Sequence, residues 1–216
     1  MGINTPKKPA VDNLNPRSTR EKILDAAIDL FSQRGFNGVS VREITGKVGI
    51  KESSLYNHFK SKDEILDTIL GLFKSELARS GPPEEQLYQM MASMPPLEYL
   101  RFSASIFIEQ MSTPTNQKIW RILALEQFYN EKAREFFLVD LVEEPKRALE
   151  MSYKIMIELG HIRVLDPEAL ADEYMTYTLG LFFEYLVLKY VDGMGLPEIQ
   201  KRTFEHIDFF WELIKK

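Results

Sequence analysis

The chain has 216 residues, of which 44% are hydrophobic and 27% are charged, and it contains no cysteine. These values are typical of a globular protein, and the lack of cysteine excludes disulfides, thiolate metal sites and a cysteine nucleophile. No apolar run approaches the ~20 residues that a membrane span needs. Residues 1–16 carry lysines without an apolar segment, which predicts a polar disordered arm instead of a signal peptide, and a cytoplasmic protein that does not enter the membrane.

The net charge of −5 argues against nucleic-acid binding until its distribution along the chain is considered. Residues 1–62 hold 11 Lys and Arg against 6 Asp and Glu, whereas the remaining 154 residues hold 16 against 26. DNA is therefore attracted by the N-terminal part and repelled by the rest. The three histidines, His58, His161 and His206, lie far apart and form no ligand pair, so the sequence predicts neither a metal site nor a cofactor.

Helix signals dominate from residue 17 onward and strand-type alternation is nowhere sustained, which predicts an all-α fold. Three helix starts are each marked by a serine with a glutamate three residues later, the pattern of a capping box. They lie at Ser18, Ser40 and Ser61, and their helices are expected to end near residues 35, 48 and 79. After the second of these helices, Gly49 predicts a left-handed turn that leads into a short helix over residues 51–59.

The sequence from Ser80 to Pro83 cannot continue a helix, because proline removes a backbone donor and restricts the residue before it. We place the boundary between two modules there. The expected domains are a helix-turn-helix domain over 17–62 with three helices, a connecting helix over 63–79, and a helical-bundle domain for effector binding and dimerisation over 84–216. Further helices are expected over 84–94, 97–111, 114–137, 143–159, 167–191 and 197–214.

A helix, a glycine turn and a second helix is how many proteins present one helix to the major groove of DNA. In the second helix of this pair, Leu55 and Phe59 are four residues apart and are expected to face the core with Ile44 and Val48. The side chains left to exposed or flanking surfaces are suited to bases and phosphates: Lys51, Glu52, Ser53, Ser54, Tyr56, Asn57, His58, Lys60 and Lys62. On the other flank, Thr19, Arg20 and Arg42 lie at helix N-termini, where they can clamp the DNA backbone.

Residues 38–66, GVSVREITGKVGIKESSLYNHFKSKDEIL, resemble the DNA-binding module of the tetracycline-repressor (TetR) family, and the resemblance covers about residues 18–77. Its most diagnostic part is the segment 54–64. The resemblance implies phosphate contacts by Tyr56, His58 and Lys62, base-edge positions for Lys51, Ser53, Ser54 and Asn57, and support of the clamp by Ser40 and Arg42. For Tyr56 and His58, residue type alone fits partial burial between helices equally well. Two positions depart from the pattern of the family. Thr45 and Gly46 stand where small residues, usually alanine, are typical. Glu52 stands where a basic residue is frequent, so it either reads a base or faces away from the phosphates.

Beyond residue 84 the chain is rich in aromatic and methionine side chains but carries no catalytic signature. Such residues at helical spacing are explained by core packing, yet they also line pockets for apolar or amphipathic ligands. The candidate effector-pocket residues are Met94, Phe102, Phe107, Met111, Trp120, Tyr129, Tyr153, Met156, Tyr174 and Tyr177. Glu109 and Glu126 interrupt apolar stretches and face either a ligand or a solvated helix surface.

The last two expected helices carry more apolar surface than one core-facing stripe needs, which predicts a partner. The candidate dimer-interface residues are Leu179, Phe182, Phe183, Leu186, Val187, His206, Phe209, Phe210 and Leu213. The TetR resemblance implies that these two helices pair with their twins in a four-helix interface. A two-fold homodimer of this kind would place its reading helices ~34–36 Å apart on a palindromic operator.

These features favour a sequence-specific DNA-binding regulator, namely a repressor that a small apolar or amphipathic effector releases from double-stranded operator DNA. The fourth helix is expected to carry the conformational change from the effector-binding module to the DNA-binding module. Two alternatives stay open. A regulator without a small-molecule ligand would have a solid core in place of a cavity. A helical-bundle enzyme would need a nucleophile–base pair or a metal cluster, and the sequence offers neither, so we expect no enzymatic activity.

Overall fold

The computed structural model describes residues 17–77, 84–190 and 195–216 and is helical through most of them. The elements in chain order are α1 (Thr19–Arg34), α2 (Val41–Val48), α3 (Glu52–Leu55), α4 (Lys62–Leu77), α5 (Glu84–Ser93), α6 (Pro96–Gln110), α7 (Pro114–Glu126), α8 (Glu131–Leu138), η1 (Val139–Glu143), α9 (Glu144–Glu158), α10 (Pro167–Phe183), η2 (Glu184–Leu188) and α11 (Leu196–Ile214). The all-α prediction is confirmed, because the described residues contain no strand beyond an isolated antiparallel bridge between Ile162 and Lys215. The predicted arm at 1–16 and the predicted boundary at 80–83 lie outside the described residues.

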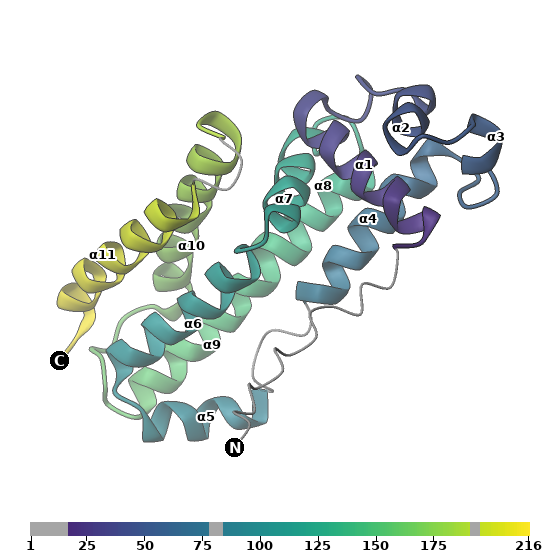
Figure 1. The fold of residues 1–216 in the computed structure, drawn as a ribbon. Coiled ribbons are helices and arrows are strands. Elements are labelled where there is room, and N and C mark those ends of the chain that lie inside the picture. The colour runs from purple at the N-terminus through teal and green to yellow at the C-terminus, as the bar shows by residue number, and fades with distance from the viewer. Residues whose placement is uncertain (1–16, 78–83, 191–194) are drawn as a thin grey trace, which may run out of the picture.

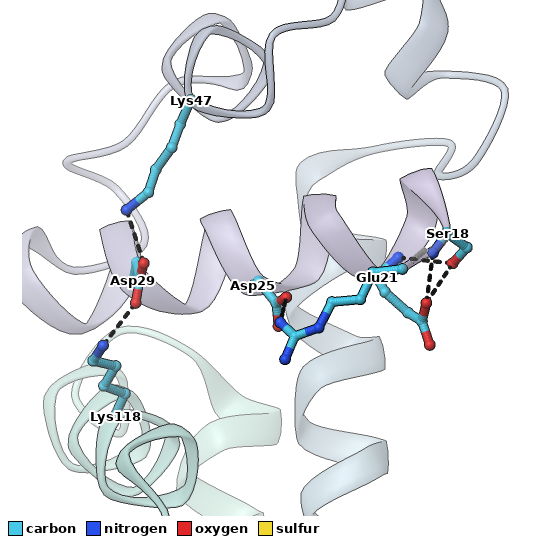
Figure 2. A network of polar contacts seen from close by, with 7 residues as sticks. Ser18, Glu21, Asp25, Asp29, Lys47 and Lys118 are labelled. Atoms are coloured by element: carbon cyan, nitrogen blue, oxygen red, sulfur yellow. Dashed lines mark hydrogen bonds and ion pairs between the residues drawn. The ribbon is translucent and has the colours of Figure 1, made fainter. Parts of the chain in front are cut away.

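The first two helices begin with the predicted capping boxes. The Glu21 backbone N–H donates to the Ser18 hydroxyl at 3.3 Å, and the Glu21 carboxylate accepts the Ser18 backbone N–H at 2.7 Å (Figure 2). In the same way, the Glu43 N–H donates to the Ser40 hydroxyl at 3.3 Å, and the Glu43 carboxylate accepts the Ser40 N–H at 2.8 Å. Each box satisfies backbone donors that a helix N-terminus leaves unpaired. At the end of α2, Gly49 has φ 78° and takes the left-handed conformation that the sequence predicts.

The start of α4 and the length of α3 differ from the prediction. The Ser61 hydroxyl accepts the Glu64 N–H at 3.1 Å, but the Glu64 carboxylate accepts the Lys60 N–H at 2.6 Å, one residue before the expected partner. The helix expected over 51–59 covers only four residues and ends in a turn, in which the N–H groups of His58 and Phe59 both donate to the Leu55 carbonyl. A helix this short depends on tertiary packing, because its few internal bonds cannot offset the cost of nucleation.

The helix predicted over 114–137 is wrong as a single element. It is broken after Glu126, and α8 begins at a new cap, where the Asn130 side chain accepts the Ala133 N–H at 3.0 Å. At its other end α8 does not stop near residue 137. It continues through the π-helical turn η1 into α9, and α10 passes in the same way into η2. Asparagine is a preferred N-cap residue, so Asn130 was the local signal for this break.

The buried apolar side chains form two clusters, which we call the head core and the base core. The head core joins α1–α4 to α7 and α8 and includes Phe31, Leu55, Phe59, Ile69, Trp120, Phe136, Phe182 and Leu186. The base core joins α5, α6, α9, α10 and α11 and includes Leu87, Tyr99, Ala104, Tyr153, Tyr174, Ile207 and Phe210. Figure 1 shows α2 and α3 at one end of the molecule, with α7 and α8 beside α1 and with α5 at the opposite end. The helices α7 and α8 therefore share their core with the N-terminal helices, although the sequence places them in the second module.

Candidate DNA interface and effector cavity

The short helix α3 is held on the protein by its apolar side chains. Leu55 and Phe59 are almost completely buried, together with Ile44 of α2, and Val48 packs partly against the same cluster. This core face agrees with the one that the spacing predicts. The opposite face of α3 and the turn after it are therefore directed away from the protein.

Most of the predicted DNA-contacting side chains are exposed. Arg20, Ser40, Arg42, Lys51, Glu52, Ser53, Tyr56, Asn57, His58 and Lys60 are exposed, and Thr19 and Ser54 are half-buried. The Tyr56 side chain is 52% exposed, so the alternative in which it is buried between helices is wrong. Arg42, Lys51 and Lys60 form no ion pair with other described residues. Their positive charges are therefore available to an external anion.

Lys62 differs from the other predicted phosphate ligands. Its ammonium donates to the backbone carbonyls of Phe36 and Val39, each at 2.9 Å, and lies 4.0 Å from the centroid of the Phe36 ring. Lys62 thus ties the start of α4 to the segment between α1 and α2. Lys62 therefore holds the helix-turn-helix together in the free protein, and its contact with a phosphate stays a prediction.

Two other predicted contacts have structural partners of their own. The Arg20 guanidinium lies 4.6 Å from the Phe59 ring centroid, and the Ser40 hydroxyl belongs to the cap of α2. The Ser40 backbone N–H, then its hydroxyl, and finally Arg34 hold the pKa of Glu43 down to about 2. Glu52 lies in the first turn of α3, where a negative charge complements the helix dipole; this is a physical reason for an acidic residue in an otherwise basic region.

A second candidate site is a cavity of about 770 Å³ between the two cores. Its walls come from α4, α6, η1, α9 and α10, with single residues of α5, α7 and α11. Its apolar lining includes Leu77, Leu87, Tyr99, Ala104, Phe107, Ile108, Trp120, Leu141, Leu149, Tyr174, Met175 and Phe182. Trp120 and Phe182 belong to the head core, whereas Tyr99 and Tyr174 belong to the base core.

Only some of the predicted pocket residues line this cavity. Phe107, Trp120 and Tyr174 line the cavity, whereas Met94, Phe102, Met111, Tyr129, Tyr153, Met156 and Tyr177 do not. Phe102 and Tyr129 are exposed, Tyr129 to 80%, because it lies in the break between α7 and α8. Met111, Tyr153 and Met156 are fully buried in the cores, and Tyr177 stacks on His206 with ring centroids 3.7 Å apart.

The polar groups of the cavity are neutral inside and charged at its edge. The Tyr99 hydroxyl hydrogen-bonds the Ser152 hydroxyl at 3.0 Å, and burial raises the pKa of Tyr99 despite this bond. Burial also raises the pKa of Tyr174. The charged lining residues are paired: Lys74 with Asp140 at 2.9 Å and Arg147 with Glu144 at 2.6 Å. The cavity is therefore suited to an apolar or amphipathic molecule.

The predicted dimer-interface residues divide into three groups by their exposure. Phe183, Phe209 and Leu213 are exposed, and Leu188 adds a large exposed apolar side chain beside them in sequence. Leu179 and Val187 are half-buried. Phe182, Leu186, His206 and Phe210 are buried within the chain itself, so their assignment to an interface is wrong. The reason is that the N-terminal part of α10 packs in the base core, whereas its C-terminal end and η2 pack in the head core.

Both glutamates that interrupt apolar stretches are now placed. Glu109 is exposed, as a solvated helix surface requires. Glu126 is 4% exposed, and its carboxylate accepts the backbone N–H of Phe36 at 2.7 Å. Glu126 faces neither a ligand nor solvent, which contradicts both interpretations of its position.

The described residues contain neither a candidate metal site nor a candidate membrane-spanning helix. In residues 17–77, 84–190 and 195–216, no three His or acidic side chains are grouped so that they could hold a metal ion. Over the same ranges, none of the helices is long and apolar enough to cross a membrane.

Comparison with known proteins points to one family. The model of the family described as bacterial regulatory proteins, tetR family, matches residues 23–69. The HTH-type transcriptional repressor KstR2 of Mycolicibacterium smegmatis is 26% identical over 210 residues, covering 83% of this chain and 95% of the relative. The structure of the ketosteroid transcriptional regulator KstR2 of Mycobacterium tuberculosis has a TM-score of 0.65 at 21% identity, covering 93% of this chain and 96% of the other. A transcriptional regulator of Saccharomonospora viridis, solved in complex with choline, has a TM-score of 0.62 at 21% identity, covering 91% and 97% of the two chains.

Proposed function

The chain belongs to the TetR family of transcriptional regulators, and on that premise we propose that it is a homodimeric repressor which a small apolar or amphipathic effector releases from a palindromic operator. The observation that carries this proposal is the combination of an exposed reading surface on α3 with a cavity of about 770 Å³ between the two cores. That volume lies within the range of about 300–1,000 Å³ that is usual for small-molecule sites.

On the DNA side, the exposed residues divide by chemistry into two sets. Lys51, Ser53 and Asn57 carry donors and acceptors that match base edges in the major groove. Arg42, Tyr56, His58 and Lys60 lie on the flanks of the same surface, where they are suited to phosphates. The phosphate contacts would set the orientation, and the base contacts would supply the sequence preference.

A two-fold dimer supplies the second reading helix. The exposed Phe183, Leu188, Phe209 and Leu213 give α10, η2 and α11 an apolar surface that a second copy of the chain would cover. A palindromic operator with half-sites about one helical turn apart, ~34–36 Å, follows from this symmetry.

The cavity supports an effector that is mostly apolar. Its interior hydroxyl groups are neutral and its charged residues form ion pairs at the edge, so a ligand with a net charge buried inside would lack a partner. One structural neighbour, a ketosteroid transcriptional regulator, is in keeping with a mostly apolar effector.

The DNA-binding part can be tested with a selection. The purified protein is used to select duplexes from a random-sequence pool, and affinities for a selected duplex and a scrambled one are compared at one salt concentration. Asn57→Ala should reduce the preference for the selected duplex about tenfold or more, since one bidentate base contact is worth about 1–3 kcal/mol. Lys60→Ala should weaken both duplexes equally, and Lys201→Ala on the exposed surface of α11 serves as the control. A wild-type protein that binds both duplexes equally would refute the proposal.

A further inference from the structure

Three side chains of α7 fasten it to α1 along the second half of that helix. The Lys118 ammonium bonds the Asp29 carboxylate at 2.8 Å, and the Arg121 Nε–H donates to the Ser32 carbonyl at 2.7 Å. At the end of α7, the Glu126 carboxylate accepts the N–H of Phe36, the second residue after α1. The contacts occur in the same order along both helices, so α1 and α7 run side by side in the same direction.

The fastening extends to the helix-turn-helix through Asp29. Figure 2 shows the Asp29 carboxylate between Lys118 of α7 and Lys47 of α2, at 2.8 and 2.9 Å. Burial raises the pKa of Asp29, but the hydrogen bonds from the two lysines outweigh it, and the pKa lies below its ordinary value. The ionised carboxylate thus joins α7 to both α1 and α2.

Arg121 also reaches a third element. Its Nη1 donates to the carbonyls of Val187 at 2.6 Å and Leu186 at 3.2 Å, in the last turn of η2. The last carbonyls of a helix have no partner within the helix, and a cation there is favoured by the helix dipole. One guanidinium therefore connects the C-terminal end of α1 with the C-terminal end of α10 and η2.

The position of Arg121 relates these contacts to the cavity. Its neighbour Trp120 lies in the cavity wall and contacts Phe182 of α10, another wall residue, with ring centroids 5.9 Å apart. A molecule in the cavity would press on the head core through Trp120 and on the base core through Tyr174. The cavity is lined by Trp120 alone from α7, and by Lys74 and Leu77 near the C-terminal end of α4.

We propose that Arg121 is the positioning residue through which occupancy of the cavity changes the orientation of the helix-turn-helix relative to α10 and α11. The inference rests on the proposed function, in which the cavity regulates DNA binding. A displacement of α7 moves Arg121, which must then either carry α1 with it or release the carbonyls of η2. Two such alternative arrangements are what a switch between conformations requires. This route through α7 adds to the one through α4 that the sequence favours.

The test needs an occupant of the cavity, and Ala104→Trp supplies one from the chain itself. Ala104 is 7% exposed and lines the cavity from α6, so an indole at this position fills part of the space without an added ligand. Because the chain has no cysteine, cysteines introduced at the exposed positions Ser53 in α3 and Glu158 in α9 are unique sites for spin labels. Labelled protein is mixed with excess unlabelled protein, and the distance between the two labels is measured by pulsed electron paramagnetic resonance.

We expect Ala104→Trp to shift the mean label distance by about 2 Å. In the Arg121→Met background the shift should disappear. Arg121→Lys keeps the charge but loses the planar fork, so it should restore only part of the shift. The control is Arg101→Met, which removes hydrogen bonds to Asp208 between α6 and α11 at 3.1 and 2.5 Å and leaves α1 untouched. This control should retain the full shift, because a general loss of stability does not cancel it.

A second readout is the affinity for the selected duplex in the same four backgrounds. Ala104→Trp should weaken binding about tenfold in the wild-type background and less than about twofold with Arg121→Met. The inference is overturned if Arg121→Met leaves both effects of Ala104→Trp intact, or if Ala104→Trp changes neither the distance nor the affinity. If Arg121→Met does not fold, Arg121→Gln, which keeps one donor group, is judged by the same criteria. A wild-type protein without DNA preference would refute the proposed function, and the label distances would still decide the role of Arg121.

Discussion

The capping contacts at the starts of α1 and α2 and the contacts that place helices α6–α11 against one another differ in range. In the first region, the polar contacts at the helix starts join residues three or four apart, as in Ser18 with Glu21 and Ser40 with Glu43. In the second, the contacts that place the helices join distant residues, such as Tyr99 with Ser152, 53 residues apart, and Arg121 with Leu186, 65 residues apart. Short-range contacts leave a readable pattern in the sequence, whereas long-range ones depend on how the helices pack.

This difference matters for function, because the two regions are not independent. The head core contains α7 and α8 as well as the DNA-binding helices, and the bond between Glu126 and Phe36 spans 90 residues. The helix-turn-helix can be recognised from local sequence signals, but it is held in place by α7, which local signals assign to the other module. The following variants test this comparison, from the largest expected effect to the smallest, with unfolding measured at one fixed protein concentration because a dimer is expected.

The packing of α3 should be the most sensitive feature. Phe59→Ala removes a fully buried ring beneath a helix of four residues, and we expect a loss of about 3–5 kcal/mol in the free energy of unfolding. Urea denaturation followed by circular dichroism measures it. The control Tyr56→Ala, at a side chain that is 52% exposed, should change stability by about 0.5 kcal/mol or less. Equal losses in the two variants would contradict the assigned core face.

The long-range bond of Glu126 should come next. Glu126→Ala leaves the Phe36 N–H without its acceptor, which is expected to cost about 1–3 kcal/mol in the free energy of unfolding. Glu126→Gln keeps an oxygen that can accept the same N–H and should recover most of this loss. Glu109→Ala, at an exposed glutamate, is the matched control. If Glu126→Ala were no worse than Glu109→Ala, the connection between α7 and α1 would not contribute to stability.

The local cap of α2 should have a smaller effect. Ser40→Ala removes the hydroxyl that accepts the Glu43 N–H, and the expected loss is about 1 kcal/mol. Ser53→Ala is the control, because this exposed serine lies within α3 and does not cap it. Thermal unfolding of the two variants compares them directly, and a midpoint for Ser40→Ala at or above that of Ser53→Ala would count against the cap.

The weakest expected effect is a pH dependence from the same cap. The pKa of Glu43 is about 2 in the folded protein against an ordinary value of 4.5, so its ionised form stabilises the folded state above about pH 4.5. This contribution should be lost progressively as the pH falls from about 4.5 toward about 2. Denaturation series across this range should show a steeper loss of stability for wild type than for Glu43→Gln. Parallel curves would mean that Glu43 has no such role.

The candidate site was predictable in the same uneven way. The reading surface on α3 followed from the spacing of Leu55 and Phe59, because a helix of known core face has a known outer face. Lys62 was not predictable, since residue type cannot distinguish a lysine that binds phosphate from one that binds nearby carbonyls. Of the aromatic residues proposed for an effector pocket, Phe107, Trp120 and Tyr174 line the cavity, and the others are explained by exposure or by core packing.

The sequence alone determined the helical class, the ends of α1 and α2, the glycine turn at Gly49 and the outer surface of α3, because each depends on residues within one or two helical turns. The tertiary structure decided which residues of α10 are buried in each core and what Glu126 and Arg121 bind. Those outcomes depend on which helices pack together. The hydrophobic periodicity of a helix shows that it has a buried face, but it does not show which of the two cores that face joins or that a cavity lies between them. The tertiary structure therefore decides how the DNA-binding helices are connected to the cavity.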